Sequence, residues 1–175
     1  GWIVGITNAI NLIDGLDGLS SGIALISCVS MLIIFALNGS PIIAILLITA
    51  LAGGLSGFLP FNFNPAKIFM GETGSAFLGF TLGTISIMGL VKSYTAIAII
   101  VPLVVLGLPI FDTAFAIIRR VLSGKSPMQA DRGHLHHRLV DSGLSQKQSV
   151  LILYIISAFL GLAGIVLIET GIWKF

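Results

Sequence analysis

The strongest constraint in this sequence is a series of long apolar stretches. Five of them approach or reach the roughly 20 residues that a helix needs to cross a bilayer, at residues 19–37, 42–61, 75–91, 95–118 and 150–168. Only 9% of the residues are charged and 56% are hydrophobic, whereas about a quarter of the residues in a soluble domain are charged. We therefore predict an all-α, polytopic integral membrane protein with about five transmembrane helices.

The connections between these stretches differ in composition, and this difference predicts the topology. If each stretch crosses once, residues 8–18, 62–73 and 119–149 share one face of the membrane and hold nearly all the polar chemistry. The third connection holds six of the nine Lys and Arg residues, and the positive-inside rule places such a loop in the cytoplasm. We expect residues 1–175 to form a single membrane-embedded domain with these three segments as cytoplasmic loops.

Two further features bear on the architecture. The chain opens at Gly1 without an initiator Met or a basic leader, so we expect an earlier part of the protein, with functional residues of its own, to precede it. Glycines recur inside the apolar stretches, as in Gly53-Gly54 and in Gly161 with Gly164, which favours close helix packing in lipid.

The first polar motif places two amides and two carboxylates at intervals of three residues, at Asn8, Asn11, Asp14 and Asp17. On a helix, each neighbouring pair would share a face. Ionised carboxylates at membrane depth are costly unless they line a polar cavity or have a partner. The motif therefore indicates a cation or substrate site, and the alternative is that these side chains cap or bridge helices.

The second polar motif precedes the third apolar stretch. It contains Lys67 and then the segment Met-Gly-Glu-Thr-Gly-Ser, in which Glu72 is the acidic residue. A helix that begins near Ser75 would direct free N–H groups at an anion, and a carboxylate is a ligand that magnesium prefers. This pattern indicates a phosphate and metal site; ordinary capping of the helix by Thr73 or Ser75 is the alternative.

The third polar motif is a dense group of basic residues, at Arg119, Arg120, Arg132, His134, His136, His137 and Arg138. Such a group suits a multiply charged phosphate ester. A zinc site is the weaker interpretation, because the histidine spacing is not i, i+4 and the single cysteine lies inside an apolar stretch. A loop anchored to anionic lipid headgroups would explain the basic residues but not the three histidines. Asp112, inside an apolar stretch, would pair with a basic group or orient a neighbouring helix.

In this order, the three motifs resemble those of the polyprenyl-phosphate N-acetylhexosamine-1-phosphate transferases, of the glycosyltransferase family 4 type. The resemblance covers nearly the whole chain and rests on residues 8–18, 69–75 and 131–138, which end in His-Leu-His-His-Arg. It implies transfer of N-acetylglucosamine 1-phosphate from UDP-GlcNAc to undecaprenyl phosphate with release of UMP, a first membrane step of cell-wall polymer synthesis such as that of teichoic acid or O-antigen. Glu72 departs from the pattern, since the family usually has Asp there, and the family's paired-aspartate motif is absent from this sequence.

The resemblance also implies roles for the candidate residues. Magnesium, with manganese as the alternative ion, would be held by Glu72, Asp14 and Asp17. Catalytic roles are implied for Asp14, Asp17, His134, His136 and His137, the histidines facing the pyrophosphate. Substrate binding is implied for Asn8, Asn11, Lys67, Arg119, Arg120, Arg132 and Arg138.

The implied partners are a UDP-sugar nucleotide, a polyprenyl phosphate and the bilayer, with no nucleic acid; a homodimer stays open. The implied location is the bacterial plasma membrane, with multiple crossings and the active site on the cytoplasmic face. Three other functions stay open. A phospho-N-acetylmuramoyl-pentapeptide transferase would share the mechanism, a transporter would need more acidic residues inside its spans than Asp112, and a scaffolding subunit would not need the clustered histidines.

Overall fold

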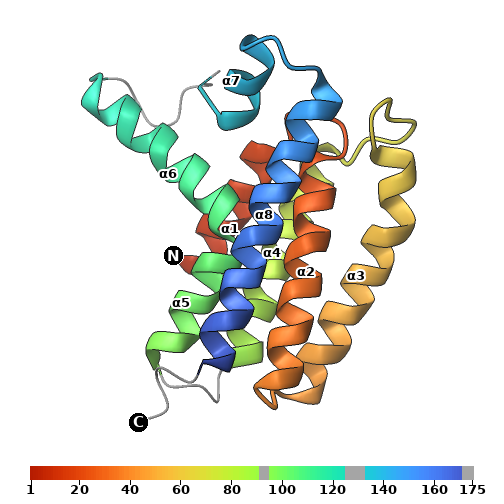
Figure 1. The fold of residues 1–175 in the computed structure, drawn as a ribbon, viewed down its shortest axis with the longest axis vertical. Helices are drawn as coiled ribbons and strands as arrows, with labels where there is room; N and C mark the ends of the chain where they lie inside the picture. The colour runs from red at the N-terminus through yellow and green to blue at the C-terminus, as the bar shows by residue number, and fades with distance from the viewer. Residues whose placement is uncertain (91–94, 125–132, 171–175) are drawn as a thin grey trace.

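The computed structural model describes residues 1–90, 95–124 and 133–170, and the regular elements within these ranges are all α-helices (Figure 1). In chain order they are α1 (Trp2–Ile13), α2 (Leu19–Leu37), α3 (Ile42–Asn62), α4 (Gly71–Leu90), α5 (Thr95–Val105), α6 (Gly107–Leu122), α7 (Leu135–Asp141) and α8 (Gln146–Glu169).

Four of the described helices, α2, α3, α4 and α8, are long and apolar enough to cross a membrane. They match four of the predicted spans, and their mean hydropathies range from 1.4 to 2.7. The pair α5 and α6 brings the number to five when the two are taken together as one broken span. The prediction of an all-α, polytopic membrane protein with about five spans is therefore confirmed.

The span predicted at residues 95–118 is not one straight helix. Helices α5 and α6 meet at an angle of 85° on either side of Leu106. Pro109 has no N–H group to donate to the carbonyl of Val105, so the helical hydrogen bond is missing at this point. Beyond this break α6 leaves the line of the bundle (Figure 1) and brings its polar residues toward α7.

Two helices extend into segments that we expected to be loops. Helix α1 continues to Ile13, so Asn8 and Asn11 lie on a helix instead of in a loop at residues 8–18. The buried side chains of α1 recur at helical spacing and explain its length; they are Ile6, Ala9, Ile10 and Ile13. Helix α4 begins at Gly71 within the predicted loop 62–73, and residues 119–149 contain the end of α6, α7 and the first turn of α8.

Small residues allow close approach at some helix contacts. A Cβ on Gly79 of α4 would lie 2.7 Å from the Cα of Thr7 in α1, and a Cβ on Gly161 of α8 would overlap the side chain of Ser30 in α2. By contrast, Gly53 and Gly54 of α3 have nothing within 4 Å of their Cβ positions in the part of the chain described. The expectation of glycine-mediated packing therefore applies to α8 and not to this segment of α3.

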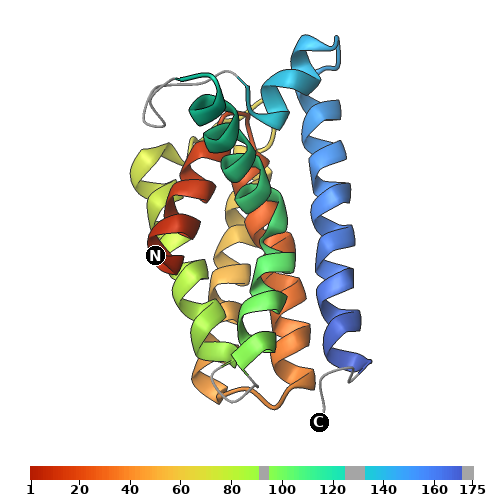
Figure 2. The ribbon, with the colours of Figure 1, turned by 90° about the vertical axis from the view of Figure 1, so that its left-hand side faces the viewer.

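The polar segments gather at one end of the bundle. The connections from α1 to α2 and from α3 to α4 lie there, together with α7 (Figures 1 and 2). Figure 2 shows α8 along one side of the bundle with α7 above it at this end. The short turn between α2 and α3 lies at the opposite end.

Candidate functional site

A polar cavity of about 500 Å³ opens at the end of the bundle where the polar segments gather. Four predicted site residues line it: Asn11, Asp14, Asp17 and Glu72. The other walls are formed by residues for which the sequence predicted no catalytic, binding or metal role of their own: Gly15, Leu16, Asn62, Phe69, Met70, Gly71 and Ser75. Most of these lie inside or next to the first two motifs, so the motifs were the only signal in the sequence that could have indicated them.

Asp14 lies at the C-terminal cap of α1, where it faces the cavity. The hydroxyl of Ser20 donates a hydrogen bond to its Oδ1 atom. Burial raises the pKa of the Asp14 carboxyl above its usual value, and the hydrogen bond from Ser20 opposes part of that rise. A carboxylate in this position gains from a cation close by, because a cation offsets the cost of desolvation.

Asp17 uses one oxygen to hold the connection between α3 and α4. Its Oδ2 atom accepts hydrogen bonds from Asn64 Nδ2 at 3.0 Å and from the Ala66 N–H at 3.1 Å. Asn64 Nδ2 also donates to Gln146 Oε1 of α8 at 2.7 Å. Asp17 therefore fixes the segment that leads to Glu72, and Asn64 extends this link to α8.

Glu72 and Asn62 face the cavity from the two ends of this connection. Glu72 is exposed in the first turn of α4, directly after Gly71, which has a positive φ of 69°. Asn62 is buried: its Nδ2 donates to the Ile68 carbonyl at 3.0 Å, and its Oδ1 accepts from the Ser21 hydroxyl at 2.6 Å. The buried amide thus shapes the connection, whereas the carboxylate of Glu72 stays accessible to a ligand.

The histidine motif begins at His134, the N-terminal cap of α7, and continues along its first turn. The rings of His134 and His136 stack with centroids 5.8 Å apart, and those of His136 and His137 lie 4.2 Å apart. His136 is 1% exposed, and neither of its ring nitrogens has a hydrogen-bond partner in the described residues. Burial first, and then repulsion from His137, lowers its pKa to about 4. The ring is therefore neutral at physiological pH.

The ring of His136 connects the histidine motif to the aspartate motif. A Cβ on Gly15 would overlap its Nε2 atom, so α7 lies directly against the loop between Asp14 and Asp17. These segments are far apart in the sequence, and the tertiary fold brings them together.

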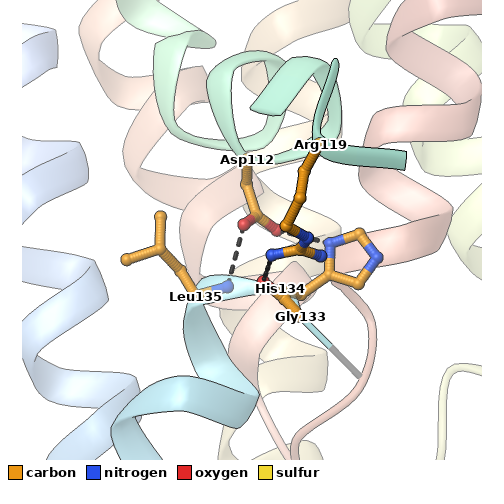
Figure 3. Close-up of polar contacts among 5 residues, drawn as sticks. All are labelled: Asp112, Arg119, Gly133, His134 and Leu135. Atoms are coloured by element: carbon orange, nitrogen blue, oxygen red, sulfur yellow. Dashed lines mark hydrogen bonds and ion pairs between the residues drawn. The ribbon is translucent and has the colours of Figure 1, made fainter. Parts of the chain in front are cut away.

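Residues of α6 hold the start of the histidine motif (Figure 3). Asp112 is 4% exposed, and its Oδ2 lies 2.9 Å from His134 Nδ1. Its Oδ1 accepts a hydrogen bond from the Leu135 N–H at 2.8 Å. Arg119 Nη1 donates to the Gly133 carbonyl at 2.9 Å. Asp112 thus pairs with a basic group, as the sequence suggested, and that group is His134.

The described members of the other predicted binding residues lie outside the walls of the polar cavity. Asn8 and Lys67 are exposed, on α1 and in the connection before α4. Arg138 lines an apolar groove of about 440 Å³ between α6 and α7. Arg120 lies in the last turn of α6, and Arg132 falls outside the described residues.

Comparison with known proteins identifies the family. A family model described as "Glycosyl transferase family 4" matches residues 1–90. The chain is 50% identical over 173 residues to the "Probable undecaprenyl-phosphate N-acetylglucosaminyl 1-phosphate transferase" of Bacillus subtilis (strain 168), covering 98% of this chain and 48% of that protein. This membrane protein belongs to glycosyl transferase family 4.

Two other relatives show how the similarity is distributed. The chain is 38% identical over 189 residues to the "Decaprenyl-phosphate N-acetylglucosaminephosphotransferase" of Mycolicibacterium smegmatis, covering 96% of this chain and 46% of the relative. It is 48% identical over 88 residues to the "Phospho-N-acetylmuramoyl-pentapeptide-transferase" of Chlamydia trachomatis serovar D, covering 49% of this chain and 26% of the relative. The chain thus spans about half the length of the first two relatives.

Proposed function

We propose that this chain forms part of the active site of an enzyme that transfers N-acetylglucosamine 1-phosphate from UDP-GlcNAc to undecaprenyl phosphate and releases UMP. In this proposal, residues 1–175 act as one membrane-embedded domain, and the reaction is a first membrane step in making a cell-wall polymer. The observation that carries it is the polar cavity lined by Asn11, Asp14, Asp17 and Glu72, with the histidine helix against its loop. The names of the two relatives matched along nearly the whole chain support an N-acetylglucosamine phosphate as the transferred group and a polyprenyl phosphate as the acceptor.

The proposed reaction needs positioning and charge neutralisation more than covalent chemistry by the protein. A phosphate oxygen of the lipid attacks the sugar-side phosphorus of the donor. The bond from that phosphorus to the bridging oxygen breaks, and UMP leaves with that oxygen. The histidines of α7 would face the pyrophosphate, where donors aimed at developing charge lower the barrier. Asn11, on the wall of the cavity, would orient the donor.

The described side chains fit a magnesium site that the substrate completes. Asp14 and Glu72 supply hard oxygen ligands on the cavity wall, and magnesium is commonly held by one or two carboxylates together with substrate phosphates. In the described residues, no three His, Cys, Asp or Glu side chains gather to hold a metal, so phosphates or other parts of the protein would complete its coordination. Asp17 Oδ2 is bound to the connection between α3 and α4. Its other oxygen, Oδ1, would be the atom that binds the ion. When bound, the ion would neutralise charge on the phosphates.

The cavity also has a wall suited to a nucleobase. The ring of Phe69 lines the cavity, and the residue is 73% exposed. Stacking of a base on an aromatic ring contributes about 1–3 kcal/mol. We assign the uracil of the donor to this ring, which would direct the pyrophosphate toward Asp14 and Glu72.

The acceptor lipid needs an apolar groove that leads to the polar end. One groove of about 520 Å³ lies between α3 and α4 and shares Phe69 and Met70 with the polar cavity. A second, of about 340 Å³, lies between α1 and α6 and includes Ile6 and Ile110. Both grooves have mainly apolar walls, as a polyprenyl tail requires. Each is formed in part by a helix that also carries a polar site residue, Glu72 on α4 for the first groove and Asn11 on α1 for the second.

The location of the site follows from the same proposal. The basic residues of α6 and α7 lie at the end of the bundle that holds the cavity, and such residues favour the cytoplasmic side. We place the protein in the bacterial plasma membrane with this end in the cytoplasm, where a nucleotide sugar is available.

UMP release by the full-length protein in detergent tests the proposal. Polyprenyl phosphate is supplied with either UDP-GlcNAc or the muramoyl-pentapeptide nucleotide, with and without magnesium. We expect magnesium-dependent release with UDP-GlcNAc only. Release with the muramoyl nucleotide only would establish the second candidate, which the partial match to the Chlamydia transferase favours. Absence of release with either donor from a folded protein would contradict both.

A further inference from the structure

Asp112 is a buried carboxylate that the proposed reaction does not use directly. It lies on α6 and is 4% exposed, beside the apolar side chains of that helix. An ionised carboxylate in such surroundings is costly unless its oxygens are hydrogen-bonded. Both oxygens are engaged by the histidine segment, Oδ2 by His134 Nδ1 at 2.9 Å and Oδ1 by the Leu135 N–H at 2.8 Å.

We propose that Asp112 is a positioning residue that acts on the reaction through His134. A carboxylate only accepts hydrogen bonds, so the proton of the neutral His134 ring must be on Nδ1 for the 2.9 Å contact to form. This fixes the tautomer in which Nε2 is the unprotonated nitrogen. Nε2 is then the ring atom that meets a phosphate, either as an acceptor or, after proton uptake, as a donor.

The second oxygen of Asp112 fixes the place of the ring. It holds the backbone of Leu135, the first residue of α7, while Arg119, two turns further along α6, holds the Gly133 carbonyl at 2.9 Å. The chain is thus bound to α6 on both sides of His134 (Figure 3). Because both its tautomer and its backbone are set from α6, the ring is held in one orientation relative to α6.

The test starts with Asp112→Asn. The amide keeps the size of the carboxyl group, and its oxygen can still accept from the Leu135 N–H. Its NH₂ group, however, donates to Nδ1, which moves the ring proton to Nε2. We expect kcat for UMP release to fall about 10- to 100-fold, as for residues that orient a catalytic group, while KM for UDP-GlcNAc stays within about threefold. Asp141→Asn, on the exposed end of α7, is the matched acid-to-amide control and should leave kcat unchanged.

A spectroscopic readout separates this role from a merely structural one. ¹⁵N NMR of the histidine side chains in the full-length protein reports which ring nitrogen carries the proton. We expect His134 to carry it on Nδ1 in the wild type and on Nε2 in Asp112→Asn. This readout does not need turnover, so it tests the inference even if the proposed transferase activity, on which the kinetic measurements rest, proves wrong. The same ring state in both proteins would overturn it.

Two more variants keep the inference testable if Asp112→Asn is unstable. Asp112→Glu retains the charge and should retain the Nδ1 proton and more activity than the amide. His134→Ala should make the identity of residue 112 irrelevant, so Asp112→Asn in that background should cost no further activity. Additive losses in the double variant, or wild-type kcat in a folded Asp112→Asn protein, would show that Asp112 does not act through His134.

Discussion

The ring of His136 lies against the backbone of Gly15, so closely that a side chain on Gly15 would overlap the Nε2 atom. Gly15 belongs to the loop that carries Asp14 and Asp17, and His136 belongs to α7. This contact directly connects the loop that carries the cavity's two aspartates with the histidine motif. Its integrity should therefore affect both the stability of the fold and the activity.

Gly15→Ala should disrupt this contact. The added methyl group has to displace the His136 ring or the loop, and overpacking of a buried site typically costs about 1–3 kcal/mol. We expect a lower Tm in detergent and a lower rate of UMP release. Gly53→Ala is the matched control, because its Cβ position in α3 has nothing within 4 Å among the described atoms. Gly15→Ala with a wild-type Tm would show that the ring is not held at this place.

Acidification should destabilise the protein through His136. Its pKa in the fold is about 4, below the ordinary value of 6.5, so between these pH values the unfolded chain binds a proton that the folded chain does not. The free energy of unfolding therefore decreases as the pH falls from 6.5 toward 4. Among the described residues, the titratable groups that affect the pKa of this ring are His134, His137 and Asp112.

Tm measured from pH 7.5 to pH 4.5 checks this prediction. His136→Asn removes the titrating ring, so its Tm should fall less over this range than that of the wild type. His137→Asn, a change of the same kind on the neighbouring residue, should retain most of the wild-type dependence. An equal fall in Tm for the wild type and His136→Asn would contradict the assignment.

Glu72→Gln should abolish most of the activity if Glu72 holds the ion. The amide retains the size of the side chain but loses the charge that binds magnesium, and we expect kcat to fall on the order of 100-fold. Glu72→Asp restores the carboxylate and should retain substantial activity with a changed magnesium dependence. Glu169→Gln, at the far end of α8, is the control. Unchanged, magnesium-dependent release by Glu72→Gln would exclude this residue as a ligand.

Asn64→Asp should disturb the connection between α3 and α4. It places a second carboxylate 3.0 Å from Asp17 Oδ2 in place of a donor, and loss of a partly buried hydrogen bond costs about 1 kcal/mol. We expect a lower Tm and a higher KM for the nucleotide. Adding Asp17→Asn restores a donor and acceptor pair and should recover part of the Tm. No recovery in the double variant would show that the two side chains do not interact.

The sequence by itself determined the helical membrane architecture. Apolar stretches of about 20 residues have few alternatives to a helix in a bilayer, and four of the five predicted spans have helices close to their expected bounds. The polar motifs predicted Asn11, Asp14, Asp17 and Glu72 as site residues, and all four line the cavity. These features depend on local composition and spacing, which a sequence contains.

Other features were decided only by the tertiary structure. Local signals such as Pro109 were present in the sequence, but the direction of α6 after the break at Leu106 depends on how it packs against other helices. The pairing of Asp112 with His134 and the contact of His136 with Gly15 join residues far apart in the chain. Such contacts follow from the packing of whole helices against one another. Residue spacing indicates which face of a helix is buried, but it does not name the residue on another helix that this face will meet.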